Sequence, residues 1–136
     1  MGIFEYALVE AISNPKLDNR DHLPLIHRLL RQANKQKLLE GHEPPNPLPA
    51  TLYRGVYGTR RYVRKGVSWT SSYKTALWFA NRFDGVKPAV YSVEVTLQDI
   101  CAYLGEPEQE YILLLPSNAK IHRIKIDRAD LAAAEG

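Results

Sequence analysis

Two carboxylates stand close together at the entrance to an apolar segment. The stretch EPEQEYILLLP, residues 106–116, places Glu108 and Glu110 two positions apart, directly before the apolar run. In an extended chain such residues project from the same face, so both side chains would enter one cleft. Neighbouring carboxylates repel each other when both are ionised, which raises the pKa of one of them and suits acid–base chemistry or a developing cation. For an isolated pair, a solvated strand edge whose charges deter aggregation is the favoured interpretation.

An arginine lies inside a segment that otherwise has the composition of a buried strand. Arg54 occurs in TLYRGVY, where a long cation is costly unless it meets an anion. A guanidinium forks well onto a phosphate or a carboxylate, and Gly55 permits a ligand to approach the backbone closely. An edge-strand arginine in a structural salt bridge is an equally good interpretation of Arg54 alone.

Two small hydroxyls follow in the short segment GVSWT. Ser68 and Thr70 share one face of a predicted strand, and Trp69 lies on the other. Hydroxyls of this kind can orient a carboxylate or hold a sugar hydroxyl. Taken alone, they are more simply a polar strand edge and a helix cap.

The elements that would position these residues are mixed. Residues 1–40 predict helices, the clearer one capped by Asp21 with an apolar face formed by Leu25, Ile26, Leu29, Leu30 and Ala33. The proline-rich stretch GHEPPNPLP predicts an extended linker. Beyond it, TLYRGVY, GVSWT, AVYSVEV, EYILLLP and AKIHRIKI predict strands. SSYKTALWFANRF predicts a helix capped by Ser71 or Ser72, and TLQDICAYL fits either a short helix or a strand with a turn.

The bulk composition is that of one ordinary globular domain. The chain has 136 residues, of which 45% are hydrophobic and 24% charged, and its formal net charge is +3. Basic side chains outnumber acidic ones in residues 51–100 and the reverse holds in residues 101–136, which suits an anionic ligand in the middle of the chain. Cys101 fits a core residue, the histidines lack metal-site spacing, and no leader or membrane span is evident. We therefore expect a soluble cytoplasmic protein without a metal.

Taken in order, these segments resemble the Arg-Ser-Glu class of mono-ADP-ribosyltransferases over residues 52–116. LYRG is similar to the first motif of that family, and EQEYILLLP to its Glu-x-Glu motif. SWTSSYKTALWFA is similar to the Ser-Thr-Ser motif, in which an alanine lies eight residues after the first serine, as Ala76 does after Ser68. Trp69 departs from the pattern by taking the second hydroxyl position, which leaves it as core filler or as a wall of the nicotinamide pocket.

The resemblance implies an α+β fold and an NAD-dependent reaction. The expected fold is a single domain in which a short helical lobe with its linker, residues 1–48, precedes a split β-sandwich transferase core, residues 49–130. The expected reaction moves ADP-ribose from NAD, the substrate, to a protein acceptor, with arginine favoured, and releases nicotinamide. A phage-encoded modifier of host proteins fits these features, as does an effector or toxin domain freed from its carrier.

The resemblance also implies roles for individual residues on the NAD side of the site. Glu110 would hold the ribose hydroxyl and stabilise the cation that develops on the sugar. Ser68 would brace Glu110, and Thr70 would supply a second hydroxyl. Arg54 would bind NAD through its phosphates, and the backbone of Gly55 would meet the nicotinamide amide.

On the acceptor side, Glu108 would hold or help deprotonate the incoming nucleophile, and Tyr103 would lie in the loop where the family recognises its acceptor. A core role for Tyr103 is equally open. A run of cations without an intervening acid comprises Arg60, Arg61, Arg64 and Lys65. It predicts a solvated hairpin, an extension of the pyrophosphate site, or a docking surface for an acidic partner, including nucleic acid. Two alternative functions therefore stay open: the same chemistry on nucleic acid or simple NAD hydrolysis, and a non-catalytic binding module on the same fold.

Overall fold

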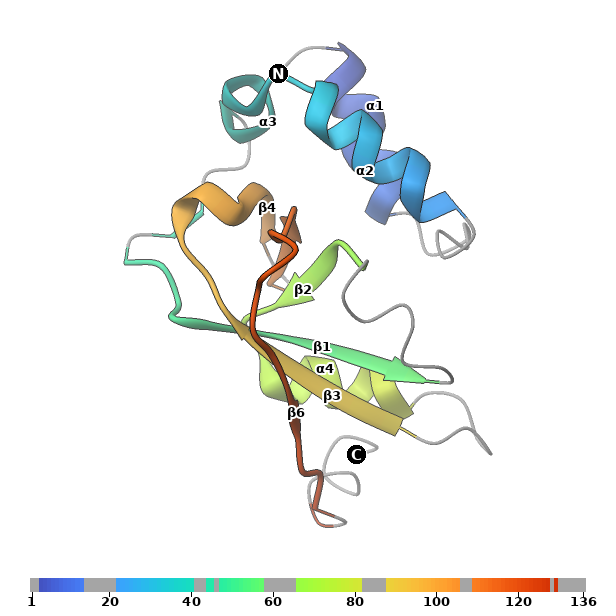
Figure 1. Cartoon of the computed structure of the whole chain (residues 1–136), viewed down its shortest axis with the longest axis vertical. Helices are drawn as coiled ribbons and strands as arrows, with labels where there is room; N and C mark the ends of the chain where they lie inside the picture. The colour runs from blue at the N-terminus through green and yellow to red at the C-terminus, as the bar shows by residue number, and fades with distance from the viewer. Residues whose placement is uncertain are drawn as a thin grey trace.

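The computed structural model of the chain describes residues 3–13, 22–40, 44, 45, 47–57, 66–81, 88–105, 109–127 and 129. Three helices form an N-terminal lobe at one end of the molecule, and a fourth lies behind the central strands (Figure 1). The remaining elements form one antiparallel sheet. The fold is therefore α+β, as expected. None of the described helices has the length and apolar character that a membrane span requires.

The helical lobe consists of α1 (Ile3–Ser13), α2 (Leu23–Gln32) and α3 (Lys35–Glu40). In α2 the residues that face the core are Leu23, Ile26 and Leu30, and a proline in the first turn suits the helix start, where its missing N–H costs nothing. The expectation that Leu25 belongs to the buried face is wrong, since its side chain is 43% exposed. The apolar face begins at Leu23, one turn before Ile26. The prediction of Asp21 as the cap is wrong, since the residue at the N-cap position is His22, whose side chain makes no capping hydrogen bond.

Hydrogen bonds from the side chains of Asn34 and Lys35 hold α3 in place. The side chain of Asn34 accepts a hydrogen bond from the backbone N–H of Lys37 at 3.1 Å, which caps the helix start. The ammonium of Lys35 donates to the carbonyls of Leu97 (3.3 Å) and Gln98 (2.8 Å). The lobe is therefore tied to the sheet domain by hydrogen bonds as well as by its apolar face.

The sheet has six strands in the order β4-β5-β2-β1-β3-β6, and all neighbouring pairs are antiparallel. The strands are β1 (Thr51–Tyr57), β2 (Ser68–Thr70), β3 (Pro88–Glu94), β4 (Ile100–Gly105), β5 (Glu110–Leu113) and β6 (Ile121–Ile124). A 3-10 turn, η3 (Leu97–Asp99), precedes β4, so the ambiguous stretch TLQDICAYL is a turn followed by a strand. Thr96 and Asp99 cap this turn reciprocally.

The sheet consists of two halves, β4-β5-β2 and β1-β3-β6, which meet at a single residue pair. Strand β1 pairs with β3 along its whole length, and β2 pairs with β5 through all three of its residues. Between β1 and β2 the register has only Tyr53 opposite Thr70. The backbones of β1 and β2 therefore stop pairing beyond Tyr53, in the region where Arg54 and Ser68 lie.

Helix α4 (Tyr73–Asn81) packs against one face of β1 and β3. Ser72 caps it, because its hydroxyl accepts the backbone N–H of Thr75 at 3.1 Å, which confirms one of the two predicted caps. Ala76 and Ala80 are completely buried. A Cβ at Gly55 would lie 1.8 Å from the carbonyl oxygen of Ala76, so only glycine lets the helix approach β1 this closely.

Opposite faces of the sheet belong to different parts of the core. One cluster takes Leu52 and Val93 from the first half of the sheet and Trp69, Ile100, Tyr111 and Leu113 from the second. On the other face, the three lobe helices cover Ile112, Cys101 and Ala102, while α4 covers Val90. Cys101 is 6% exposed and thus a core residue, as predicted.

Candidate functional site

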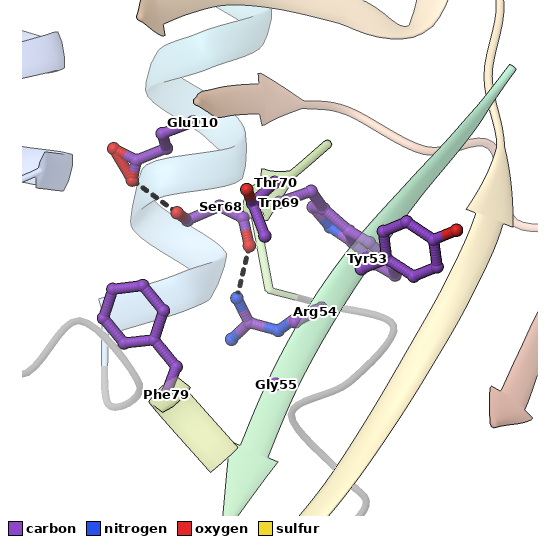
Figure 2. A pocket seen from close by; sticks show the side chains of 8 residues that line it. All are labelled: Tyr53, Arg54, Gly55, Ser68, Trp69, Thr70, Phe79 and Glu110. Atoms are coloured by element: carbon purple, nitrogen blue, oxygen red, sulfur yellow. Dashed lines mark hydrogen bonds between the residues drawn. The ribbon is translucent and has the colours of Figure 1, made fainter. Parts of the chain in front are cut away.

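A pocket opens where the two halves of the sheet separate (Figure 2). Its lining comes from β1, β2, α4 and the first residue of β5, and consists of Tyr53, Arg54, Gly55, Ser68, Trp69, Thr70, Phe79 and Glu110. The pocket therefore brings together the arginine, the two hydroxyls and one of the two glutamates that the sequence pattern singles out.

Strand pairing places the polar residues on one face. Thr70 lies opposite Tyr53 on one side and opposite Glu110 on the other, and directly opposed residues of adjacent strands share a face. Ser68 joins them because it is two residues from Thr70. The hydroxyl of Ser68 donates a hydrogen bond of 2.5 Å to Oε2 of Glu110. This contact turns the carboxylate toward Ser68, as Figure 2 shows.

Arg54 reaches the same pocket across the seam between β1 and β2. Its Nη1 donates a 2.7 Å hydrogen bond to the backbone carbonyl of Ser68, and Figure 2 shows the guanidinium directed from β1 toward that residue. Burial lowers the pKa of Arg54 to about 10, although the negative charge of Glu110 acts in the opposite direction. Its Nε is buried and has no hydrogen-bond partner among the described residues. Arg54 thus stays cationic at neutral pH.

Thr70 and Ser71 make hydrogen bonds at the end of β2, close to Glu110. The side chain of Thr70 accepts the backbone N–H of Ser72 at 3.0 Å, which shapes the connection from β2 into α4. Ser71 contacts Gln109 twice: its hydroxyl donates to the side-chain oxygen at 2.7 Å, and its N–H donates to the carbonyl at 3.3 Å. Gln109 is thereby fixed directly before Glu110.

The expected extended entrance to β5 is wrong. Gln109 has a φ of 49°, in the left-handed region, and the strand begins only at Glu110. The rule that places residues i and i+2 on one face requires an extended residue between them, so it does not relate Glu108 to Glu110 here. Glu108 lies outside the described residues, as do the cations Arg60, Arg61, Arg64 and Lys65.

Trp69 belongs mainly to the core. Its indole is 1% exposed, and its N–H donates to the carbonyl of Gly66 at 3.1 Å. It packs with Leu52 and Tyr111 on the face opposite the Ser68 hydroxyl. Of the two roles that the sequence left open, this geometry favours core filler.

Tyr103 is not in a loop. It lies within β4, and its ring packs against that of Tyr111 with centroids 4.7 Å apart. The expected position of Tyr103 in a loop is wrong because β4 continues to Gly105, which has a positive φ of 71°. Irregular register between Tyr103 and Gly105 accompanies this end. Tyr103 is not among the residues that line the pocket.

Three residues near Arg54 and Ser68 were not singled out for the site. Phe79 and Tyr53 line the pocket, and Gly66 lies against the guanidinium of Arg54. Phe79 lies three residues after Ala76 in the predicted helix, and that spacing, which puts both on one helix face, is the signal that could have placed it near β1. Tyr53 lies two residues before Gly55 in β1, so strand alternation could have placed both on the face that lines the pocket.

The described part of the chain holds no group of three or more His, Cys, Asp or Glu side chains that could bind a metal ion. The pocket's functional groups are thus a guanidinium, two hydroxyls and a carboxylate, between an aromatic helix residue and a glycine. This set can bind an anionic ligand through Arg54 and stabilise positive charge beside Glu110. No protein-family model, no curated protein and no solved structure matches this chain.

Proposed function

We propose that the protein is a mono-ADP-ribosyltransferase that moves ADP-ribose from NAD to a protein acceptor, with arginine favoured. The observation that carries the proposal is the hydrogen bond from Ser68 to Glu110 in a pocket that also contains Arg54. An arginine, a hydroxyl and a carboxylate from three different strands converge there, in the combination that the motif resemblance implies. The seam between the two sheet halves and the cluster shared by both fit a split β-sandwich core.

The residues of the pocket match the charges of the proposed reaction. The bond between nicotinamide and C1′ of the ribose breaks, nicotinamide leaves with the bonding electron pair, and positive charge develops on the sugar. Glu110 stabilises that charge, and the hydroxyl of Ser68 holds the carboxylate in place. Arg54, which lines the pocket, offers its positive charge to the pyrophosphate.

An acceptor nitrogen then attacks C1′ and loses a proton. In our proposal Glu108 receives that proton or orients the acceptor.

Substitution of Glu110 by Gln tests the proposal. The change removes the negative charge and keeps the shape, so we expect nicotinamide release from NAD to fall about 10²- to 10³-fold. The matched control is Glu94→Gln, since Glu94 is an exposed carboxylate on β3. Release would be followed with NAD labelled in the nicotinamide ring. Equal turnover in wild type and Glu110→Gln contradicts the catalytic role of Glu110, and the absence of turnover in the wild type favours a binding module.

The acceptor class is tested with NAD labelled in the adenylate, incubated with a cell lysate. Label that resists nuclease and disappears with protease supports a protein acceptor, and mass spectrometry then locates the modified residue. Label removed by nuclease points to nucleic acid. Release of free ADP-ribose without any labelled macromolecule identifies NAD hydrolysis instead.

A further inference from the structure

Two glycines near the pocket are required for different physical reasons. At Gly55 the atoms that a Cβ would meet belong to the backbone of α4, which cannot move without shifting the helix. At Gly66 the three nearest atoms all belong to the guanidinium group of Arg54: Cζ at 2.2 Å, Nη2 at 2.3 Å and Nε at 2.4 Å. A side chain at position 66 therefore collides with Arg54.

The backbone conformation of Gly66 does not itself require glycine. Among the described glycines, Gly105 is the one with a positive φ, so Gly66 has a backbone that an L-residue can adopt. The reason for glycine at this position is then the space occupied by the Arg54 guanidinium.

We propose that Gly66 is a positioning residue, which lets the Arg54 guanidinium lie against the chain just before β2 and reach the Ser68 carbonyl. The guanidinium fills the seam where β1 and β2 have stopped pairing. Ser68 in turn holds Glu110 through its hydroxyl. Gly66 therefore acts on the pocket's cation directly and on its carboxylate through Ser68.

The proposal predicts that a side chain at position 66 displaces the Arg54 side chain without unfolding the protein. A guanidinium is the far end of a flexible side chain, so Gly66→Ala moves Arg54 and leaves the strands in place. The carbonyl of Ser68 then loses its donor and the buried Nε of Arg54 changes surroundings. The effect on Arg54 is independent of the proposed function, whereas the effect on NAD rests on it.

The first test is a double-mutant cycle measured by chemical denaturation. Gly66→Ala is expected to lower the denaturation midpoint in the wild-type background and to leave it unchanged in an Arg54→Ala background, where the collision is gone. Gly105→Ala is the matched control: its cost comes from a positive φ of 71°, so it lowers the midpoint equally in both backgrounds. An equal cost of Gly66→Ala in both backgrounds overturns the proposal. Arg54→Val, whose side chain ends before the position of Nε, replaces Arg54→Ala if the latter does not fold.

The second test observes the guanidinium itself. The Nε–H resonance of Arg54, assigned by its absence in Arg54→Lys, should shift or exchange faster in Gly66→Ala, while backbone amides of α1 and α2 keep their positions. In the kinetic assay, Gly66→Ala should raise KM for NAD on the order of ten- to a hundredfold, as expected for a weakened charged contact, with a smaller change in kcat. An unmoved resonance together with unchanged KM overturns the proposal. If the wild type has no NAD turnover, the proposed function fails, and the cycle and the resonance still decide the role of Gly66.

Discussion

The two faces of the β2–β5 strand pair have different roles, although they are formed by alternating residues of the same two short strands. On one face, Trp69 and Tyr111 lie opposite each other and are each 1% exposed. On the other, Ser68 and Glu110 share a hydrogen bond at the edge of a pocket. Alternation along a strand of three residues thus places a sealed core directly behind a polar site. The difference indicates that the position of the polar groups depends on the apolar packing directly behind them.

The largest effect on stability should follow from truncating Trp69, the largest side chain on the buried face. Trp69→Ala deletes a fully buried indole and the hydrogen bond from its N–H to Gly66, so we expect a loss of about 3–5 kcal/mol in the free energy of unfolding. Chemical denaturation measures this loss. Trp78→Ala is the control, since Trp78 is 49% exposed, and it should change stability by less than about 1 kcal/mol. Similar losses for both tryptophans would contradict the comparison of the two faces.

A smaller and more selective effect should follow on the polar face. Ser68→Ala removes the donor to Glu110, a hydrogen bond to a charged group, so the barrier for NAD cleavage should rise by about 1.5–3 kcal/mol. The free energy of unfolding should change much less, because Ser68 is only partly buried. Parallel measurement of kcat/KM and the denaturation midpoint checks this. A variant that loses stability but keeps its rate would place Ser68 with the structural residues.

The smallest effect is expected at Cys101, where the helical lobe covers the continuation of the polar face on β4. The helical lobe covers Cys101 on β4, and burial raises the pKa of its thiol from 9.0 to about 11. The native thiol should therefore react slowly with iodoacetamide at pH 8, and quickly after denaturation. Because the folded pKa is the higher one, the corresponding stability is complete below pH 9 and is lost as the pH rises through 11. Cys101→Ala should reduce that alkaline loss; rapid labelling of the native protein would show that the lobe leaves this face open.

The sequence pattern predicted most elements and most of the residues that meet in the pocket. Period-two and period-three-to-four spacing placed β1, β2, α4 and β5, and with them Arg54, Gly55, Ser68, Thr70 and Glu110. The errors arose where local geometry departs from the regular period. Gln109 is left-handed in place of extended, and β4 runs on through Tyr103 with an irregular register. Nothing in the residue types alone specifies either feature.

The two glycines illustrate a second limit. Gly55 and Gly66 look alike in sequence, each next to a valine in a strand-like segment. Their reasons differ because one faces the backbone of α4 and the other a guanidinium from a different strand. Such contacts between distant segments appear only once β1, β2 and α4 have been placed relative to one another.

The single pair between β1 and β2 has a consequence for how this molecule can change over time. Adjacent strands are usually joined by a ladder of backbone hydrogen bonds. Here β1 and β2 share only the Tyr53–Thr70 pair, and next to it the side chain of Arg54 links the two strands through its hydrogen bond to the Ser68 carbonyl. A replacement of Arg54 that alters ligand preference therefore also loosens the joint between the halves. New specificities would be reached more readily from Phe79, which lines the pocket from α4 and takes no part in the β1–β2 joint.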